Sequence, residues 1–220
     1  MGILGGTFDP IHYGHLEIAN RVQQFFSCDR IYLMPAYTPP HKTKNVISSA
    51  YHRYAMAVLA TNEIEKIVVC RLELESPSQP FTVQTIAQLK KTLGTETQLF
   101  FIMGADMFCD LNNWWKHQEL IHTCRIVVVT RPEYKIDLVE RSLTLNMPIK
   151  NLCGQENYSE LDIAQEAIFY TNLAELSISA SSIRSAVAKG EPINKWVPLS
   201  VASYIAKYQL YQDQHERNNQ

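Results

Sequence analysis

Two histidines, His12 and His15, stand three residues apart directly after a glycine-rich segment, and together they are suited to holding an anion. The segment from Gly5 to His15 reads GGTFDPIHYGH, and it contains neither common phosphate-binding fingerprint, G-x-G-x-x-G or G-x-x-x-x-G-K-[ST]. Residues three apart share one face of a helix, so both imidazoles can donate hydrogen bonds to one phosphate. A metal site and a pair of surface histidines are the alternatives, although no third metal ligand is evident.

The elements around this segment explain how it would be positioned. A first strand is expected at GILG, residues 2–5, and apolar residues at helical spacing predict a helix from His12 to Phe26. The glycine-rich segment is then the first strand-to-helix connection of a parallel sheet, which is where such sheets bind ligands. Gly5 and Gly6 allow the backbone to approach a ligand closely, and the helix N-terminus suits a phosphate.

Strands and helices alternate along most of the remaining chain. Further strands are expected at residues 30–35, 66–75, 98–104, 125–132 and 167–172. Further helices are expected at residues 48–62, 80–94, 179–190 and 198–211, with a weaker one at 136–145 in the otherwise illegible stretch 133–165. This alternation predicts an α/β fold with a doubly wound, mostly parallel sheet covered on both faces.

Length and composition limit the classes of protein. The 220 residues suit a single domain, here residues 1–211, with a core at about 1–175 and a small C-terminal helical part at about 176–211. The polar residues 212–220 are expected to be a disordered tail. A net charge of −2 argues against a nucleic-acid partner, because general polyanion binders are usually strongly basic.

The lack of a recognisable targeting signal and the cysteine pattern both favour a cytoplasmic protein. The N-terminus lacks the basic and apolar regions of a signal peptide, and no apolar run approaches the roughly 18 residues that span a membrane. The five cysteines are scattered and form no C-x-x-C pair, so reduced thiols are expected. The sequence leaves monomer and homodimer equally open.

Five segments, in order, resemble one family. GGTFDPIHYGH is similar to the G-x-F-D-x-x-H-x-G-H signature of the HxGH nucleotidylyltransferase superfamily, and within it to bacterial nicotinate-nucleotide adenylyltransferases. The other four segments resemble the later motifs of that family, namely PAYTPPHK at 35–42, FTVQT at 81–85, FIMGADMFCDLNNWWKHQELI at 101–121 and ISASSIR at 178–184. The short first strand, Leu4 in place of the usual Phe, and Trp115 where Tyr is frequent depart from the pattern.

The resemblance implies a Rossmann-like fold and transfer of the adenylyl group of ATP to nicotinate mononucleotide, with Mg²⁺ bound through the ATP phosphates and no metal site of the protein's own. The phosphate nucleophile has a second pKa of about 6, so it is mostly ionised and no general base is needed. Catalysis is then positioning and charge stabilisation. The residues expected to catalyse the transfer are His15, His12, Lys42 and Arg184.

Binding roles follow from the same resemblance. The residues expected to bind ATP are Gly5, Gly6, Thr7, Phe8, His12, His15, Gly104, Asp106, Ser181, Ser182 and Arg184. The residues expected to bind the mononucleotide are Thr85, near the nicotinate carboxylate, Trp114 and Trp115, over the ring, and Lys42. Taken alone, Lys42 and Arg184 are ordinary exposed residues, Asp106 is a helix cap, and the tryptophans are one core and one surface residue.

Four other functions are alternatives to this one. An adenylyltransferase of the same superfamily that uses nicotinamide mononucleotide differs by one amide for one carboxylate, which residue spacing does not resolve. An enzyme acting on a pantetheine phosphate fits less well, since such chains are shorter and lack the tryptophan pair. A nucleotide sensor without catalysis and a fragment of an aminoacyl-tRNA synthetase are the alternatives of other classes.

Overall fold

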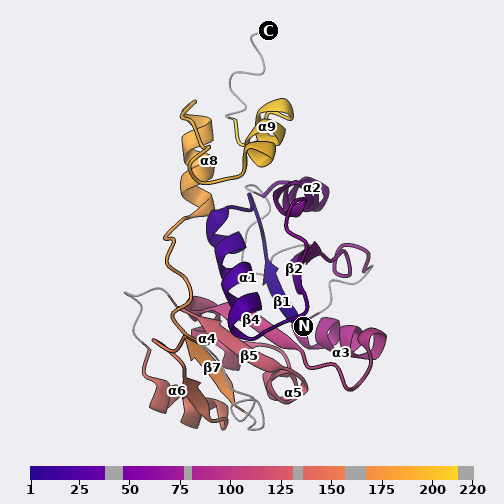
Figure 1. Cartoon of the computed structure of the whole chain (residues 1–220), viewed down its shortest axis with the longest axis vertical. Helices are drawn as coiled ribbons and strands as arrows, with labels where there is room; N and C mark the ends of the chain where they lie inside the picture. The colour runs from indigo at the N-terminus through magenta and orange to yellow at the C-terminus, as the bar shows by residue number, and fades with distance from the viewer. Residues whose placement is uncertain (38–46, 77–80, 131–135, 157–166, 213–220) are drawn as a thin grey trace.

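The protein is a layered α/β structure, in which helices lie on both sides of one sheet (Figure 1). The computed structural model describes residues 1–37, 47–76, 81–130, 136–156 and 167–212. The strands in these ranges are β1 (Gly2–Gly6), β2 (Ile31–Pro35), β3 (Ile67–Val69), β4 (Phe100–Gly104), β5 (Arg125–Val129), β6 (Ile149–Asn151) and β7 (Ile168–Thr171). They pair in the order β3-β2-β1-β4-β5-β7-β6, and every pair is parallel. The predicted doubly wound, parallel sheet is therefore confirmed.

Helices connect the strands within the described ranges. They are α1 (Tyr13–Phe25), α2 (Ala50–Thr61), α3 (Thr82–Leu93), α4 (Ala105–Asp110), the 3₁₀ helix η1 (Leu111–Asn113), α5 (His117–Thr123), α6 (Leu138–Leu145), α8 (Ala180–Ala188) and α9 (Leu199–Lys207). None of them is both long enough and apolar enough to cross a membrane.

Alternating strand residues divide the core into two layers. Phe100 and Ile102 of β4 join the cluster under α1, α2, α8 and α9, whereas Phe101 and Met103 join the cluster under α3, α4, α5 and α6. Successive side chains of a strand point to opposite faces, so one apolar strand serves both layers. This explains why β4 reads as a continuous apolar run in the sequence.

The last two helices belong to the first of these clusters. Ile183 and Ala186 of α8 and Val201 and Ile205 of α9 are buried with the sheet residues of that layer. Figure 1 shows both helices at one end of the molecule, beyond α1 and α2. They are thereby set beside the connection that follows β1.

The predicted strand at 66–75 is wrong in its second half. β3 contains only three residues, and after it the backbone turns, with the N–H groups of Leu74 and Glu75 donating to the Arg71 carbonyl. Leu72 packs against the second cluster and Glu73 accepts a hydrogen bond from Thr85. The alternating pattern therefore reflects a loop packed on α3 and not a longer edge strand.

Other element boundaries also differ from the prediction. The first helix starts at Tyr13, because His12 has an extended backbone and serves as the N-cap. The last helix ends at Lys207, and turns with positive φ at Gln209 and Tyr211 follow it. Of the predicted tail 212–220, only Gln212 lies within the described residues.

Several elements were not predicted. Between β4 and β5 the chain forms α4, η1 and α5, and β6 lies inside the stretch 133–165 that has no legible pattern. These elements are only three to seven residues long, so they are too short to show a helical or strand period. The weaker helix predicted at 136–145 is confirmed as α6, with the Asp137 side chain accepting from the first turn.

Candidate active site

The central pair of strands forms a topological switch point. β1 leads through α1 to β2 on one side, whereas its neighbour β4 leads through α4, η1 and α5 to β5 on the other side. Open parallel sheets bind ligands in the crevice at the carboxyl ends of such strands. Here these ends are Gly6 of β1 and Gly104 of β4, so the glycine-rich segment and the Gly104–Asp106 turn face the same crevice.

The glycine-rich turn is shaped by Gly6 and Phe8. A Cβ added to Gly6 would lie 2.9 Å from the ring of Phe8, so this position admits no side chain. A Cβ on Gly5 would make only ordinary contact with Phe101, at 3.6 Å. Phe8 is buried and has a φ of 51°, a strained value for a bulky residue. Gly6 therefore makes room for an aromatic residue that the backbone would otherwise avoid.

His12 and His15 occupy the two capping positions at the start of α1. His12 is the N-cap and His15 is the third helical residue, and their rings stack with centroids 3.7 Å apart. The backbone N–H of His12 donates to Nδ1 of His15 over 3.3 Å. In the neutral ring the proton is then on Nε2, which makes that atom a donor of the kind that phosphate oxygens accept.

Gly14 lies between the two histidines, and close packing explains why this position is a glycine. A Cβ at this position would lie 3.2 Å from Cε1 and Nδ1 of His12 and 3.5 Å from the Leu176 carbonyl oxygen. These contacts are tight, because His12 is almost completely buried and has little freedom to move. The spacing of the motif thus follows from packing as well as from chemistry.

Arg53 is a site residue that the sequence analysis missed. It is 1% exposed, and its guanidinium donates to the carbonyl oxygens of Thr7 and Tyr37, each at 2.8 Å, and of Ser48 at 3.1 Å. Burial lowers the pKa of Arg53, and the nearby charge of Asp9 opposes that effect. A charged residue on the apolar face of α2 was the available signal, since Arg53 is in helical register with Met56, Ala57 and Ala60.

Asp9 lies at the centre of the buried polar contacts around this turn. Its carboxylate accepts the N–H of Ser48 at 3.3 Å and the hydroxyl of Tyr211 at 2.7 Å. Its backbone carbonyl accepts Nη1 of Arg184 at 2.7 Å. The structure therefore joins Arg184, from the fifth motif, to the glycine-rich segment.

The start of α8 brings the predicted serines to the surface. Ser179 is the N-cap, and its hydroxyl pairs with that of Ser181 at 2.6 Å instead of capping the helix. Ser181 and Ser182 are exposed, and Arg184, two residues after Ser182, is half-buried. A hollow of ≈ 440 Å³ lies along this helix, lined in part by Ser181, Ser182 and Trp196.

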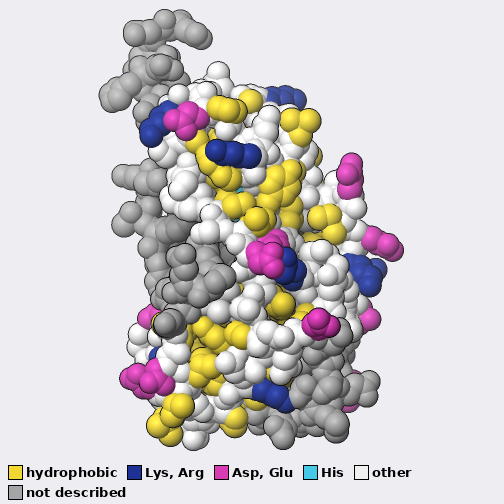
Figure 2. Space-filling model, turned by 60° about the vertical axis from the view of Figure 1, so that its left-hand side comes forward, with side chains coloured by type: hydrophobic (Ala, Val, Ile, Leu, Met, Phe, Trp, Pro, Cys, Tyr) yellow, Lys and Arg dark blue, Asp and Glu magenta, His cyan; other side chains and the backbone are white. Residues whose placement is uncertain are grey.

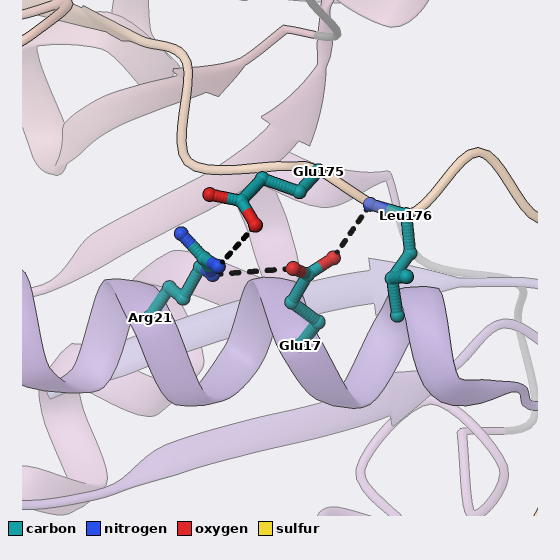
Figure 3. A network of polar contacts seen from close by, with 4 residues as sticks. All are labelled: Glu17, Arg21, Glu175 and Leu176. Carbon is teal, nitrogen blue, oxygen red and sulfur yellow. Dashed lines mark hydrogen bonds and ion pairs between the residues drawn. The ribbon is translucent and has the colours of Figure 1, made fainter.

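Polar contacts fasten the segment before α8 to α1 (Figure 3). Glu17 accepts the backbone N–H of Leu176 at 2.9 Å and pairs with Arg21 at 3.2 Å. Arg21 also contacts Glu175, at 2.7 Å. These contacts, with that between Arg184 and Asp9, hold α8 in place at two points.

Asp106 lies where β4 ends. It is exposed, and it is the second residue of α4, with Gly104 as the N-cap. A Cβ at Gly104 would lie 2.6 Å from its Oδ1, so the carboxylate folds back over the glycine. The carboxylate therefore lies at the carboxyl end of β4, which is a neighbour of β1 in the sheet.

The two tryptophans have different surroundings. Trp114 is half-buried and meets the edge of Phe101 at 6.3 Å, whereas Trp115 is 44% exposed and lies 4.8 Å from the exposed ring of Phe81. The amine of Lys116 lies 4.9 Å over the Trp115 ring. The alternative of one inner and one outer tryptophan thus describes their burial, and an aromatic surface remains at Trp115 and Phe81.

Thr85 is buried, and its hydroxyl donates to Glu73 at 3.2 Å. Burial raises the pKa of Glu73 to about 7, and the bond from Thr85 opposes that rise. The alternating pattern at 66–75 placed Glu73 in a predicted strand, so Glu73 was not among the predicted site residues. Thr85, which is predicted to lie near the nicotinate carboxylate, thus lies beside a carboxyl group of the protein itself.

Lys42 lies outside the described residues. Among the residues that are described, no cluster of three or more His, Cys, Asp or Glu side chains could hold a metal ion, and the five cysteines are free. Figure 2 shows acidic and basic side chains interspersed on one face, with hydrophobic side chains between them. The basic side chains of the described residues form no continuous patch in this view.

The fold and the arrangement at the switch point are typical of nucleotide-binding proteins of the α/β class. The cytidylyltransferase-like family model matches residues 3–186, and the chain belongs to this family. A probable nicotinate-nucleotide adenylyltransferase from Thermoanaerobacter sp. (strain X514) is 38% identical over 98% of this chain and 96% of the relative. The corresponding protein of Pseudomonas putida (strain W619) is 32% identical over 96% and 94%.

Solved structures agree on the fold. The nicotinic acid mononucleotide adenylyltransferase of Plasmodium falciparum, complexed with NaAD, is 24% identical, covers 96% of each chain and has a TM-score of 0.70. The same enzyme complexed with APC is 22% identical and has a TM-score of 0.71. The resemblance predicted from the five motifs, to the nicotinate-nucleotide adenylyltransferases, is confirmed.

Proposed function

We propose that this chain transfers the adenylyl group of ATP to nicotinate mononucleotide, giving deamido-NAD and pyrophosphate in NAD biosynthesis. The supporting observation is the stacked pair of His12 and His15 at the start of α1, beside the switch point and next to Arg184 through Asp9. The names of the relatives, which align over nearly the whole chain, point to the same reaction.

The reaction is a displacement at phosphorus. An oxygen of the mononucleotide phosphate attacks the α-phosphorus of ATP, and the bond from that phosphorus to the bridging oxygen of the β-phosphate breaks. The bond electrons leave with pyrophosphate, so atoms and charge balance without a proton transfer at the attacking oxygen. Because the nucleophile is already an anion, the protein needs only to align two repelling groups and to stabilise the leaving charge.

Each phosphate-binding residue has a distinct part in this scheme. Nε2 of His15 donates to an oxygen of the α-phosphate, where negative charge increases, and His12 supports it from the N-cap. Arg184 binds a phosphate as a planar fork, and Lys42 does so as a mobile point charge. Ser181 and Ser182 add hydroxyl donors at the exposed start of α8.

Mg²⁺ is proposed to enter with ATP. The exposed carboxylate of Asp106 suits such an ion, because Mg²⁺ binds oxygen ligands and usually takes one or two carboxylates besides phosphates. When bound, the ion neutralises the charge of the phosphates. Turnover is expected to disappear with EDTA and to return with added Mg²⁺.

The ring of the mononucleotide is assigned to the aromatic side of the crevice. Trp114 and Trp115 offer flat surfaces for a pyridine ring, and Thr85 lies on the neighbouring helix α3. Nicotinamide mononucleotide is the competing substrate, since it carries an amide where nicotinate carries a carboxylate. Gly5, Gly6, Thr7, Phe8 and Gly104 are assigned to ATP because they form the ends of β1 and β4 and the turn after β1.

A pyrophosphate-release assay tests the function. ATP is combined in turn with nicotinate mononucleotide, nicotinamide mononucleotide and phosphopantetheine. Release that is fastest with the nicotinate compound is expected. Faster release with nicotinamide mononucleotide would establish the alternative, and ATP binding without release with any acceptor would establish a nucleotide sensor.

Two further assignments complete the proposal. Residues 1–211 act as one domain, supported by the shared cluster of α8 and α9 with the sheet, and a single unfolding transition is expected. The location is cytoplasmic, supported by the five free cysteines, which persist in a reducing compartment.

A further inference from the structure

The end of the described chain reaches back to its beginning. The hydroxyl of Tyr211 donates to Oδ1 of Asp9 over 2.7 Å, although the two residues are 202 positions apart. Asp9 is 1% exposed, so this contact is inside the protein. The same hydroxyl lies 3.9 Å from the sulfur of Met56, a fully buried residue of α2.

Asp9, the partner of Tyr211, connects the residues on the proposed phosphate side of the crevice, where the glycine-rich turn and Arg184 meet. One carboxylate oxygen of Asp9 binds Tyr211, the other accepts the N–H of Ser48, and the backbone carbonyl of Asp9 binds Arg184. A rotation of the Asp9 carboxylate would disturb the backbone to which Arg184 is hydrogen-bonded. Tyr211 is therefore connected to Arg184 through a single residue.

Backbone conformation gives a second, independent sign of constraint. Phe8, directly before Asp9, has a φ of 51°, and Tyr211 has a φ of 64°. Bulky residues avoid this region unless the surrounding structure enforces it, and such strain gathers at functional sites. The ring of Phe8 meets the ring of His15 edge-on at 5.0 Å, so the strained turn also supports the histidine pair.

We propose that Tyr211 is a positioning residue for adenylyl transfer, which orients Asp9 so that Arg184 and the turn carrying Phe8 are held in place for the ATP phosphates. This inference rests on the proposed function. Tyr211 touches neither the predicted phosphate donors nor the aromatic side of the crevice in the contacts described, so it acts through Asp9. Through Tyr211, the segment after α9 is then part of the active site.

The chemistry of the hydroxyl suits a constant donor. Burial and the negative charge of Asp9 raise the pKa of Tyr211, while Ser48 and the charge of Arg184 act in the opposite direction. The phenol therefore keeps its proton to a higher pH than an ordinary tyrosine does. A tyrosine that stays neutral holds a carboxylate by one short bond without adding a charge of its own.

The test is Tyr211→Phe, which removes only the hydroxyl, with Tyr208→Phe as the matched control. Tyr208 is on the same segment and is 47% exposed. We expect Tyr211→Phe to lower kcat/KM for ATP about tenfold, because hydrogen bonds to charged groups are among the strong ones. KM for the mononucleotide is expected to change less than twofold, and Tyr208→Phe to match the wild type.

A double-mutant cycle with Arg184→Lys separates positioning from general stability. If Tyr211 acts through Arg184, the tenfold effect shrinks to about twofold or less in the Arg184→Lys background. A purely structural role would give the same factor in both backgrounds. ATP affinity, measured by calorimetry, is expected to follow the same non-additive pattern.

Each remaining outcome decides against the inference or against its basis. Wild-type ATP kinetics and affinity in Tyr211→Phe, or additive effects with Arg184→Lys, would overturn it while leaving the proposed function intact. A Tyr211→Phe protein that is unfolded at the assay temperature would assign the hydroxyl to stability alone and also overturn it. A wild-type protein that binds ATP but releases no pyrophosphate would remove the proposed function, with calorimetry still testing the link to Arg184.

Discussion

The proposed phosphate side, around Asp9, and the proposed aromatic side, around Trp115 and Phe81, are built in different ways. Around Asp9 the polar groups are buried or half-buried and hydrogen-bonded to one another, with Arg53 and Arg184 donating to backbone carbonyls. Around Trp115 and Phe81 the rings are exposed and touch mainly each other. Buried, satisfied polar networks are rigid, whereas exposed rings are free to adjust.

The difference matches what each side has to do. A reacting α-phosphate must be held in line with its nucleophile, and small displacements there are costly. A pyridine ring far from the reacting bond needs affinity and selection, which stacking provides. Substitutions on the phosphate side should therefore affect kcat, the KM for ATP or stability, whereas those on the aromatic side should affect mainly the KM for the mononucleotide and leave the KM for ATP nearly unchanged.

The largest effect is expected from His15→Ala. Loss of a donor to the charge that develops in the transition state typically costs 10²- to 10³-fold in kcat, or about 3–4 kcal/mol. Steady-state pyrophosphate release measures the rate, and circular dichroism checks that the protein is folded. His122→Ala, at an exposed position, is the control. Near-normal turnover of His15→Ala would take this residue out of the site.

Arg53→Met tests the rigidity of the phosphate side. The substitution leaves the carbonyls of Thr7, Tyr37 and Ser48 without their donor, so unfolding should become easier by about 2–3 kcal/mol. Urea denaturation measures this, with the exposed Arg30→Met as control. An unchanged midpoint would mean that the turn is held by other contacts and that the contrast between the two sides is weaker.

Glu73→Gln tests the aromatic side through pH. Because the pKa of Glu73 rises from 4.5 to about 7 on folding, the unfolded chain releases its proton first as pH increases. The free energy of unfolding therefore falls between pH 4.5 and 7, by roughly 3 kcal/mol. Glu73→Gln should not show this fall, whereas the exposed control Glu63→Gln should show it as the wild type does. Denaturation curves at pH 5 and pH 8 measure the effect, and a parallel fall in the variant would contradict it.

Arg184→Lys is expected to raise KM for ATP five- to tenfold while stability stays close to that of the wild type. Lysine keeps the charge but loses the fork that binds a phosphate and the Asp9 carbonyl at once. Initial rates at varied ATP measure the change, with Arg30→Lys as the reference. Kinetics like those of the wild type would argue against contact with phosphate through two nitrogens.

The smallest effect is expected on the aromatic side. Trp114→Ala should raise KM for the mononucleotide about fivefold with little change in KM for ATP, and it should also lower stability, since its ring packs on Phe101. Trp115→Ala should raise the same KM without that loss, because its ring is exposed. Equal increases in both KM values would undo the assignment of the ring.

The sequence predicted what local patterns encode. The strand before the glycine turn, the apolar strand β4 and the helix at α8 each show a continuous run, a period or a cap signal, and all three are present. Glu73 was missed because its loop, packed on a helix, has the alternating pattern of a strand. β6 was missed because a strand of three residues is too short to show that alternation.

The chain by itself therefore determined most of the strands and longer helices and the residues that form the turn, since neighbouring residues carry both. Only the tertiary structure decided that Arg53 closes the turn, that Tyr211 meets Asp9, and that Trp115 rather than Trp114 is open to solvent. Such contacts join residues far apart in sequence, and their geometry depends on how the sheet and its covering helices pack together. The local periodicity of the sequence does not encode that packing.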